Sequence, residues 1–341
     1  MIATTDYGLP CIIPSTVKAV IHHAPFWGRF GFSPGLLWWL IVRARDYDLI
    51  IVHDFHNFCT IAALIASVLC HRPLVIRPCG ELAGHTGHRK NWRERLGALL
   101  RRGMFRCIWG RWLVRRSVFH FTSQQERESA IRHLREPGLR CFVVPLGISL
   151  PPVLQHPVRE GNPNERKVLF LSRLHPQKGV EFLIEGFLRA LPAVPDASLI
   201  IAGGGAPAYV EQLHRQAGGH PNIRFLGMVE PERRERLFRQ ASLFVLPSYH
   251  ENFGRAVAEA LAHGVPVLVT ADVQISGDIV AAGAGEIISR DAVAIASRLA
   301  ALLQAPNQLA AMSARAVLLA ERAYSWPAVG HRLLEYYRAV I

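Results

Sequence analysis

Polar residues that could do chemistry gather in one loop, residues 247–254, in the second half of the 341-residue chain. This loop follows an apolar run typical of a buried strand and precedes a helical pattern over residues 256–263. The first turn of a helix has backbone N–H groups without intrahelical acceptors, and these groups attract anions. We therefore predict an anion site at the amides of Phe253 and Gly254, next to Asn252.

Two carboxylates flank this predicted anion site. Glu251 lies in the loop, and Glu259 follows eight residues later in the predicted helix. A carboxylate beside a phosphate is electrostatically unfavourable, so we expect both groups to bind sugar hydroxyls. An ordinary structural role for Glu259, as an acid stabilised by the helix dipole, is an equally good interpretation of its position.

A second loop, residues 172–179, also follows an apolar run and precedes a helical pattern. It carries two cations five residues apart, Arg173 and Lys178. Cationic side chains at such a spacing suit the two phosphoryl groups of a diphosphate. The alternative is a solvated loop whose two charges share no ligand.

Together, the two loops resemble those of the family 4 glycosyltransferases, which are retaining enzymes of GT-B fold. The family's R-x4-K-G pattern is matched by Arg173, Lys178 and Gly179. Its E-x7-E pattern is matched by the two glutamates of the first loop and helix. The resemblance extends from about residue 48 to the C-terminus and is most specific over residues 168–270. It implies an α/β chain with two Rossmann-like domains that face each other across a cleft, and a C-terminal helix that crosses back to the first domain.

The resemblance also implies roles for the residues of both loops. Arg173 and Lys178 would hold the diphosphate of a nucleotide-sugar donor. Glu251 would act at the donor sugar as a catalytic residue, and Glu259 would bind the ribose. Further donor-binding residues that the family's pattern implies are Gly204, Val229, Asn252, Phe253 and Gly254.

The first half matches the family less closely. A predicted strand at residues 49–52 ends at His53, which the resemblance implies to be a second catalytic residue facing the cleft. His56 is a nearby alternative, and a strand-end histidine bonded to backbone is the structural interpretation. Many family members have a His-Gly pair after the next strand, whereas this sequence has Arg77 and Gly80 there. We expect these two residues on the acceptor side, with Arg77 supplying a charge in place of the histidine.

Strands alternate with helices in both halves, which predicts parallel sheets and two domains. We assign residues 1–150 to an acceptor-side domain, 151–165 to a proline-rich linker, 166–324 to the donor-binding domain and 325–341 to a helix that packs on the first domain. Family members begin with a strand, a Gly-rich loop and a helix that have no counterpart before Thr4. The first domain is therefore expected to be incomplete at its N-terminus.

The net charge is +13, and residues 1–150 carry 20 Lys and Arg against 9 Asp and Glu. Most of this excess lies around the stretch 89–116, where apolar residues, tryptophans among them, are interleaved with arginines. Such a stretch suits the headgroup layer of an anionic membrane, where each basic residue contributes about 1 kcal/mol. A cytosolic helix pair with solvated arginines is the alternative. Nucleic acid is not expected, because no nucleic-acid motif accompanies the charge.

Other features exclude whole classes of protein. Six scattered cysteines without a CxxC pair argue against a zinc site and favour a reducing compartment, so we expect a cytoplasmic protein, peripheral on the inner face of the cell membrane. The sequence has no apolar run of about 18 residues that would predict a membrane helix. The motif Asp46-Tyr47-Asp48 spells D-x-D but precedes a strand, so we interpret it as a turn and expect neither a metal nor another cofactor.

These observations predict a glycosyltransferase that moves a hexosyl unit from a nucleotide-diphosphate sugar to a saccharide or lipid-linked acceptor with retention. Synthesis of a cell-surface polysaccharide or lipopolysaccharide is the expected context. One alternative is a non-catalytic protein that binds the nucleotide-sugar. Another is a nucleotide-sugar epimerase, which would require an acid/base pair in the first domain.

Overall fold

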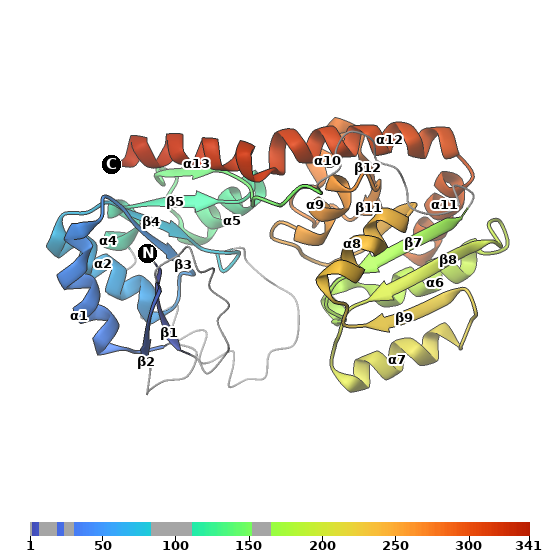
Figure 1. Cartoon of the computed structure of the whole chain (residues 1–341), viewed down its shortest axis with the longest axis horizontal. Helices are drawn as coiled ribbons and strands as arrows, with labels where there is room; N and C mark the ends of the chain where they lie inside the picture. Colours follow the sequence, from blue (N-terminus) through green and yellow to red (C-terminus); the bar gives the residue numbers. More distant parts are fainter. Residues whose placement is uncertain (1, 7–18, 24–30, 83–110, 152–164) are drawn as a thin grey trace. The chain divides into compact units, whose positions relative to one another are not determined.

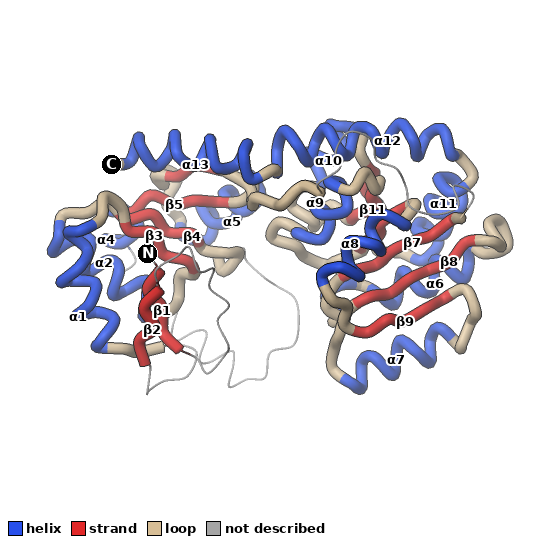
Figure 2. The backbone as a smooth tube through the Cα atoms, viewed as in Figure 1, coloured by secondary structure: helices blue, strands red, loops and turns tan. Residues whose placement is uncertain are grey.

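The computed structural model of the chain describes residues 2–6, 19–23, 31–82, 111–151 and 165–341. The chain divides into two compact units. Unit 1 comprises Met1–Val144 and Arg332–Ile341, and unit 2 comprises Pro145–His331. Both units contain parallel sheets flanked by helices, as an α/β chain should (Figure 1, Figure 2).

Unit 1 contains a four-stranded parallel sheet in the order β3-β4-β5-β6. Its strands are β3 (Ile50–His53), β4 (Leu74–Arg77), β5 (Ser117–Phe121) and β6 (Cys141–Val143). Its helical segments are α1 (Pro34–Arg43), η2 (Ala44–Asp46), α2 (Phe58–Cys70), α4 (Arg111–Arg116) and α5 (Gln124–Leu134). Helix α2 begins after Asn57, whose side-chain oxygen accepts a hydrogen bond from the N–H of Thr60 at 3.0 Å.

Two strands and helical segments precede the first strand that the sequence predicted. β1 (Ile2–Asp6) and β2 (Ala19–His23) pair in parallel as a separate two-stranded sheet, and α1 follows them. The apolar pattern of both strands is diluted by threonines and histidines, so the period that marks a strand is weak there. Helix α1 does carry a start signal, because the Ser33 side chain accepts from the N–H of Leu36 and Pro34 opens the helix.

Unit 2 contains a six-stranded parallel sheet in the order β12-β11-β10-β7-β8-β9. Its strands are β7 (Arg166–Leu171), β8 (Ala197–Ala202), β9 (Ile223–Gly227), β10 (Leu243–Leu246), β11 (Val267–Val269) and β12 (Gly285–Ile287). Its helical segments are η4 (Pro176–Lys178), α6 (Val180–Ala190), α7 (Pro207–Ala217), α8 (Pro231–Gln240), α9 (Arg255–Ala262), α10 (Ser276–Ala282), α11 (Ala292–Leu303), α12 (Pro306–Leu319) and η5 (Ala320–Tyr324).

The strand order of unit 2 reverses direction at one place. The chain runs outward from β7 through β8 to β9, returns by α8 to β10 beside β7, and then runs outward in the opposite direction. In open parallel sheets, a crevice forms at the carboxyl ends of the strands at such a switch point. The two loops that the sequence analysis singled out follow β7 and β10, so they lie on either side of this point.

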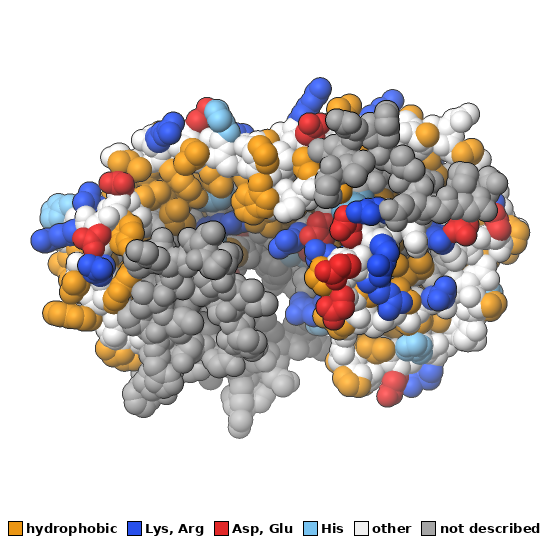
Figure 3. Space-filling view, in the orientation of Figure 1, with side chains coloured by type: hydrophobic (Ala, Val, Ile, Leu, Met, Phe, Trp, Pro, Cys, Tyr) orange, Lys and Arg blue, Asp and Glu red, His pale blue; other side chains and the backbone are white. Residues whose placement is uncertain are grey.

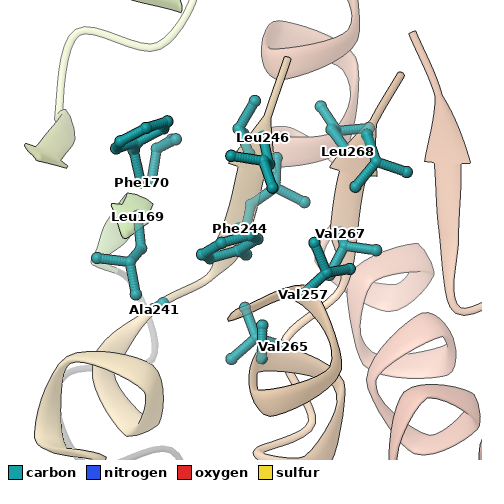
Figure 4. Packing of buried hydrophobic residues seen from close by; sticks show 14 of the residues in the cluster. Leu169, Phe170, Ala241, Phe244, Leu246, Val257, Val265, Val267 and Leu268 are labelled. Carbon is teal, nitrogen blue, oxygen red and sulfur yellow. The ribbon is translucent and has the colours of Figure 1, made fainter. Parts of the chain in front are cut away.

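The core of unit 2 explains why its central strands are uninterrupted apolar runs. Strands β10 and β11 are buried along their whole length, since helices cover both faces of the sheet. Phe244 of β10 packs among Leu169, Val257 and Val267, which come from two neighbouring strands and helix α9 (Figure 4). This packing fixes the strand ends from which the two loops emerge.

The C-terminal region of unit 2 does not continue as one regular helix to the end of the donor-side domain. Helix α12 ends at Leu319, and a π-helical turn, η5, completes the segment to Tyr324. The carbonyl of Tyr324 accepts a hydrogen bond from the N–H of Ile148 at 2.8 Å, and its hydroxyl donates to Asp278 at 3.0 Å. Helix α13 (Trp326–Val340) follows, and its residues from Arg332 onward group with unit 1.

In unit 1, those last residues of α13 pack against the edge of the sheet. The ring of Tyr336 stacks on Phe142 of β6, with 4.6 Å between ring centroids. The ring of Tyr337 meets the same phenylalanine edge-on. The predicted linker lies almost wholly outside the described residues, as 152–164 are not among them.

Candidate functional site

The loops after β7 and β10 lie directly against each other. The side-chain hydroxyl of Ser248 donates to the carbonyl of Gln177 at 3.0 Å, and the N–H of Tyr249 donates to the same carbonyl at 2.8 Å. Gly179 allows this approach, because its φ is +65° and a Cβ there would lie 2.3 Å from the carbonyl oxygen of Pro247. The glycine of the R-x4-K-G pattern is thus required by backbone contact between the loops.

This contact brings Lys178 and Glu251 together. The ammonium of Lys178 forms an ion pair with Oε1 of Glu251, and the two side chains are only 11% and 17% exposed. Glu251 is itself held from the backbone, since its N–H donates to the carbonyl of Asp272 at 3.1 Å. From the sequence, we expected Lys178 and Glu251 to contact different parts of one donor. In the structure they contact each other.

Arg173 lies at the exposed rim of the same loop. Its side chain makes no hydrogen bond or ion pair with any of the residues that the structure describes. Its backbone is well fixed, because the N–H of Leu174 donates to the carbonyl of Gly204 at 2.7 Å. A neighbouring glycine, Gly203, has φ +140° and lies so close to Ser172 that a Cβ would be 1.9 Å from that carbonyl oxygen. Arg173 is therefore a solvated cation on a rigid loop.

Helix α9 begins at the predicted anion site. Gly254, at its N-cap, has φ +77° and no side chain that could accept from the first-turn amides. Phe253 is buried, and its ring meets Tyr324 edge-on at 5.4 Å between centroids. Asn252 precedes it in the same turn. The packing of Phe253 against Tyr324 thus fixes the position of the N-terminus of α9.

Glu259 is 12% exposed and lies between two guanidinium groups. Arg255 donates to its Oε1 from Nε at 3.1 Å, and Nη1 of Arg234 in α8 lies 3.7 Å from its Oε2. This arrangement leaves both earlier interpretations open, because an ion-paired early-helix acid and a hydroxyl-binding group have the same neighbours.

Two further predicted donor-binding residues lie in the loops after β8 and β9. Gly204 faces Met228, whose sulfur would lie 3.0 Å from a Cβ placed on that glycine. Met228 is 81% exposed, whereas Val229 is partly buried against the core of unit 2. Because Met228 is exposed and the neighbouring Gly204 has no side chain, apolar surface is accessible at the carboxyl ends of β8 and β9.

Sequence reasoning missed Arg290, which follows β12. Its guanidinium forms an ion pair with Asp272, donates to the carbonyl of Ser248 at 3.2 Å and lies 4.4 Å over the ring of Tyr249. These contacts connect the loops after β10, β11 and β12. A basic residue three positions after a short strand was the available signal, but β12 itself was not predicted.

In unit 1, His53 and Arg77 are register partners at the ends of β3 and β4. Partial burial and the neighbouring charge of Arg77 lower the pKa of His53. On the next strand, His120 is almost fully buried, and its Nε2 lies 2.8 Å from the carbonyl oxygen of Val144. Burial first, and then the charges of Arg77 and His53, lower the pKa of His120 to about 4, although the bond to Val144 opposes the shift.

The buried His120 predicts a pH dependence of stability. An unfolded histidine titrates near 6.5, so between about pH 6.5 and pH 4 the unfolded chain binds a proton that the folded chain does not. Stability should therefore fall as the pH drops through this window, by roughly 2 kcal/mol between pH 6.5 and pH 5 and about 3 kcal/mol by pH 4. Urea unfolding of the native chain and of His120→Gln at both ends of the window measures the difference. Identical pH slopes for the two proteins would show that His120 does not carry the effect.

The loop after β4 is anchored inside unit 1. The N–H of Gly80 donates to Oε1 of Glu126 at 2.8 Å, and Oε2 of the same carboxylate accepts from the N–H and hydroxyl of Thr122. Glu126 is fully buried at the start of α5. The amide of Gly80 is therefore engaged by a protein carboxylate, and Glu126 is a positioning residue that sequence reasoning missed.

His56, the alternative to His53, is held by a second carboxylate. Glu81 accepts from the N–H groups of Phe55 and His56 at 2.8 and 2.9 Å and lies 3.3 Å from Nδ1 of His56. Burial alone would raise the pKa of Glu81, but these bonds outweigh it, and the pKa lies below its usual value. In the same loop, burial raises the pKa of Cys79, which disfavours its thiolate.

The expectations about a membrane and a metal concern features outside these contacts. Most of the basic stretch 89–116, proposed to face a membrane, lies outside the described residues. Among the helices that the structure describes, none is both long and apolar enough to span a bilayer. No group of three His, Cys, Asp or Glu side chains that could hold a metal occurs within those same residues. Independence of a metal stays a prediction.

Comparison with known proteins finds a family match in the second half of the chain. Residues 155–317 match the family model described as glycosyl transferases group 1. The match covers just under half of the chain, so this region is similar to the group 1 glycosyl transferases. The matched residues include the loops after β7 and β10, whose patterns carry the resemblance noted from the sequence.

Curated relatives match over the same part of the chain. An uncharacterized glycosyltransferase of Methanocaldococcus jannaschii is 40% identical over 111 residues, which are 31% of this chain and 27% of that protein. The D-inositol 3-phosphate glycosyltransferase of Segniliparus rotundus is 30% identical over 193 residues, or 53% of this chain and 41% of that protein. The match thus spans less than half of the length of either relative.

Solved structures match both units together. Anabaena HepE in complex with UDP and glucose aligns with a TM-score of 0.71 at 21% identity, over 94% of this chain and 86% of that one. The sucrose-phosphate synthase of Thermosynechococcus elongatus aligns with a TM-score of 0.74 at 18% identity, over 96% and 85%. At these identities the likeness shows the fold, which is the predicted GT-B fold with two parallel-sheet domains.

Proposed function

We propose that this chain transfers a hexosyl unit from a nucleotide-diphosphate sugar to a saccharide or lipid-linked acceptor, with retention of anomeric configuration. The observation that supports it most is the contact between Lys178 and Glu251 at the switch point of the sheet in unit 2, within the region that matches the group 1 glycosyl transferase model. A nearly buried ammonium beside the tip of a helix suits a diphosphate, and a nearly buried carboxylate suits sugar hydroxyls. Retention is part of the proposal because the loop patterns resemble those of a retaining family.

The mechanism is stabilisation of the leaving group. Donor binding would bring the diphosphate to Lys178, so that Glu251 exchanges its ammonium partner for hydroxyls of the donor sugar. Arg173 at the rim and the first-turn amides of α9 at Gly254 would neutralise the charge that develops on the departing diphosphate. Asn252, Gly204 and the surface around Val229 would hold the rest of the nucleotide.

We propose UDP as the nucleotide and the acceptor side as unit 1. The uridine assignment is supported by HepE, whose structure contains UDP. On unit 1, His53 and Arg77 lie together at the strand ends and would meet the acceptor. The cellular context proposed is cell-surface polysaccharide or lipopolysaccharide synthesis on the cytoplasmic side of a membrane.

The experiment is a transfer assay with purified chain, a panel of UDP-hexoses, and acceptors that include a bacterial lipid extract and inositol phosphate. We expect UDP release to depend on an acceptor, and the anomeric proton coupling of the product to match that of the donor. Activity unchanged by EDTA is expected, since the proposed mechanism uses no metal. Calorimetric binding of UDP without transfer to any acceptor would favour the non-catalytic alternative. Absence of both binding and transfer would overturn the proposal.

A further inference from the structure

A concave site lies on unit 2 where helix α8 packs beside the sheet. It is a cavity of about 230 Å³ between helix α8 and the strands β7, β8 and β9. Four basic side chains line it, and these are Lys167, Arg224, Arg233 and Arg236. Basic side chains gather over the part of the surface where α8 lies, next to acidic ones (Figure 3).

The cavity is distinct from the proposed donor site. Lys167 is the second residue of β7 and lies near the amino end of that strand, whereas the donor loops follow the carboxyl ends. Arg224 is paired in register with Ile200, in the middle of β8. None of the residues proposed to hold the donor belongs to its lining.

The charges of this cavity are poorly compensated. The ammonium of Lys167 forms an ion pair with Glu165. In contrast, Arg224, Arg233 and Arg236 form no ion pair with any side chain in the described part of the chain. The nearby carboxylate of Glu235 forms an ion pair with Arg239.

The walls of the cavity are both apolar and basic. Ile200, Leu226 and Leu237 supply apolar surface between the basic side chains. Arg224, Arg233 and Arg236 are exposed, and guanidinium groups that line one cavity repel each other. An anion between them would relieve this repulsion, and guanidinium forks are matched to phosphate oxygens.

We propose that this cavity binds a phosphate group, either as free phosphate or as the headgroup of an anionic phospholipid. Its volume lies below the roughly 300–1,000 Å³ typical of sites for larger organic ligands. A compact phosphate therefore fits it better than a nucleotide-sugar does. The apolar walls would accommodate the glycerol end of a lipid headgroup.

The test compares two triple variants of the full chain that lose the same charge. Arg224→Gln/Arg233→Gln/Arg236→Gln removes the three guanidinium groups of the cavity. Arg215→Gln/Arg315→Gln/Arg322→Gln removes three exposed guanidinium groups elsewhere on unit 2. Both variants keep the donor loops and the stretch 89–116, so phosphate or membrane bound there contributes equally to both. Circular dichroism melts of each variant check that the fold is intact.

Each protein is titrated with inorganic phosphate by calorimetry and sedimented with phosphatidylcholine vesicles that contain or lack phosphatidic acid. We expect the cavity variant to lose affinity by about tenfold or more, and the control variant to bind like the native chain. A loss confined to inorganic phosphate identifies the free anion, and a loss confined to phosphatidic acid vesicles identifies the lipid. Equal binding by the cavity and control variants to both probes overturns the proposal.

Discussion

Lys178→Ala is expected to lower nucleotide-sugar turnover by about 10²–10³-fold, because one donor aimed at a developing oxyanion contributes that much in enzymes of known mechanism. The substitution also leaves the carboxylate of Glu251 nearly buried without its ammonium partner. Breaking such a pair is expected to destabilise unit 2 by roughly 3 kcal/mol. Initial rates with a UDP-sugar and urea unfolding measure the two effects separately.

A double variant separates loss of function from loss of stability. Lys178→Ala/Glu251→Gln removes the unpaired charge, so it should regain much of the stability while turnover stays low. The matched control is Arg189→Ala, which breaks the exposed pair with Glu185 on helix α6 and should leave turnover unchanged. Native-like turnover in Lys178→Ala would show that this lysine does not hold the diphosphate. A double variant that regained both properties would mean that the pair is purely structural.

The second large effect is expected at Glu126 in unit 1. Its buried carboxylate accepts from the N–H of Gly80 and from the N–H and hydroxyl of Thr122, at 2.7–2.8 Å. In Glu126→Ala, three donors lose their acceptor at a site that water does not reach. At about 1–3 kcal/mol for each unsatisfied group, the expected destabilisation is about 4–5 kcal/mol.

Urea unfolding measures this loss, and Glu128→Ala on the exposed side of the same helix is the matched control, with an expected change within about 0.5 kcal/mol. Glu126→Gln keeps the shape but presents an NH₂ group to one of the donors, so an intermediate loss is expected. A loss below 1 kcal/mol in Glu126→Ala would contradict the anchoring role. Because the anchored loop begins directly after Arg77 and carries Gly80, we also expect acceptor KM to rise in any variant that remains folded.

The two classes of prediction differ in how far the sequence supports them. The sequence supports a role for Lys178 and Glu251, because each follows a predicted strand. The carboxyl ends of parallel strands lie at one edge of the sheet, so a cation after one strand can meet an acid after another. Glu126 gives no such signal, because its sequence neighbours look like an ordinary early helical turn. Its partner Gly80 is 46 residues away, and only the fold brings the two together.

The sequence by itself determined the α/β class, the alternation of strands and helices from residue 49 onward, and the two strand-to-helix loops with their charged residues. These follow from local periodicity and from the way helix tips attract anions, which are properties of neighbouring residues. Tertiary structure alone decided that Lys178 pairs with Glu251, that Glu126 holds the loop of Gly80, and that three arginines around α8 share one cavity. Such contacts depend on strand order and burial, and a linear pattern does not specify which distant loops will become neighbours.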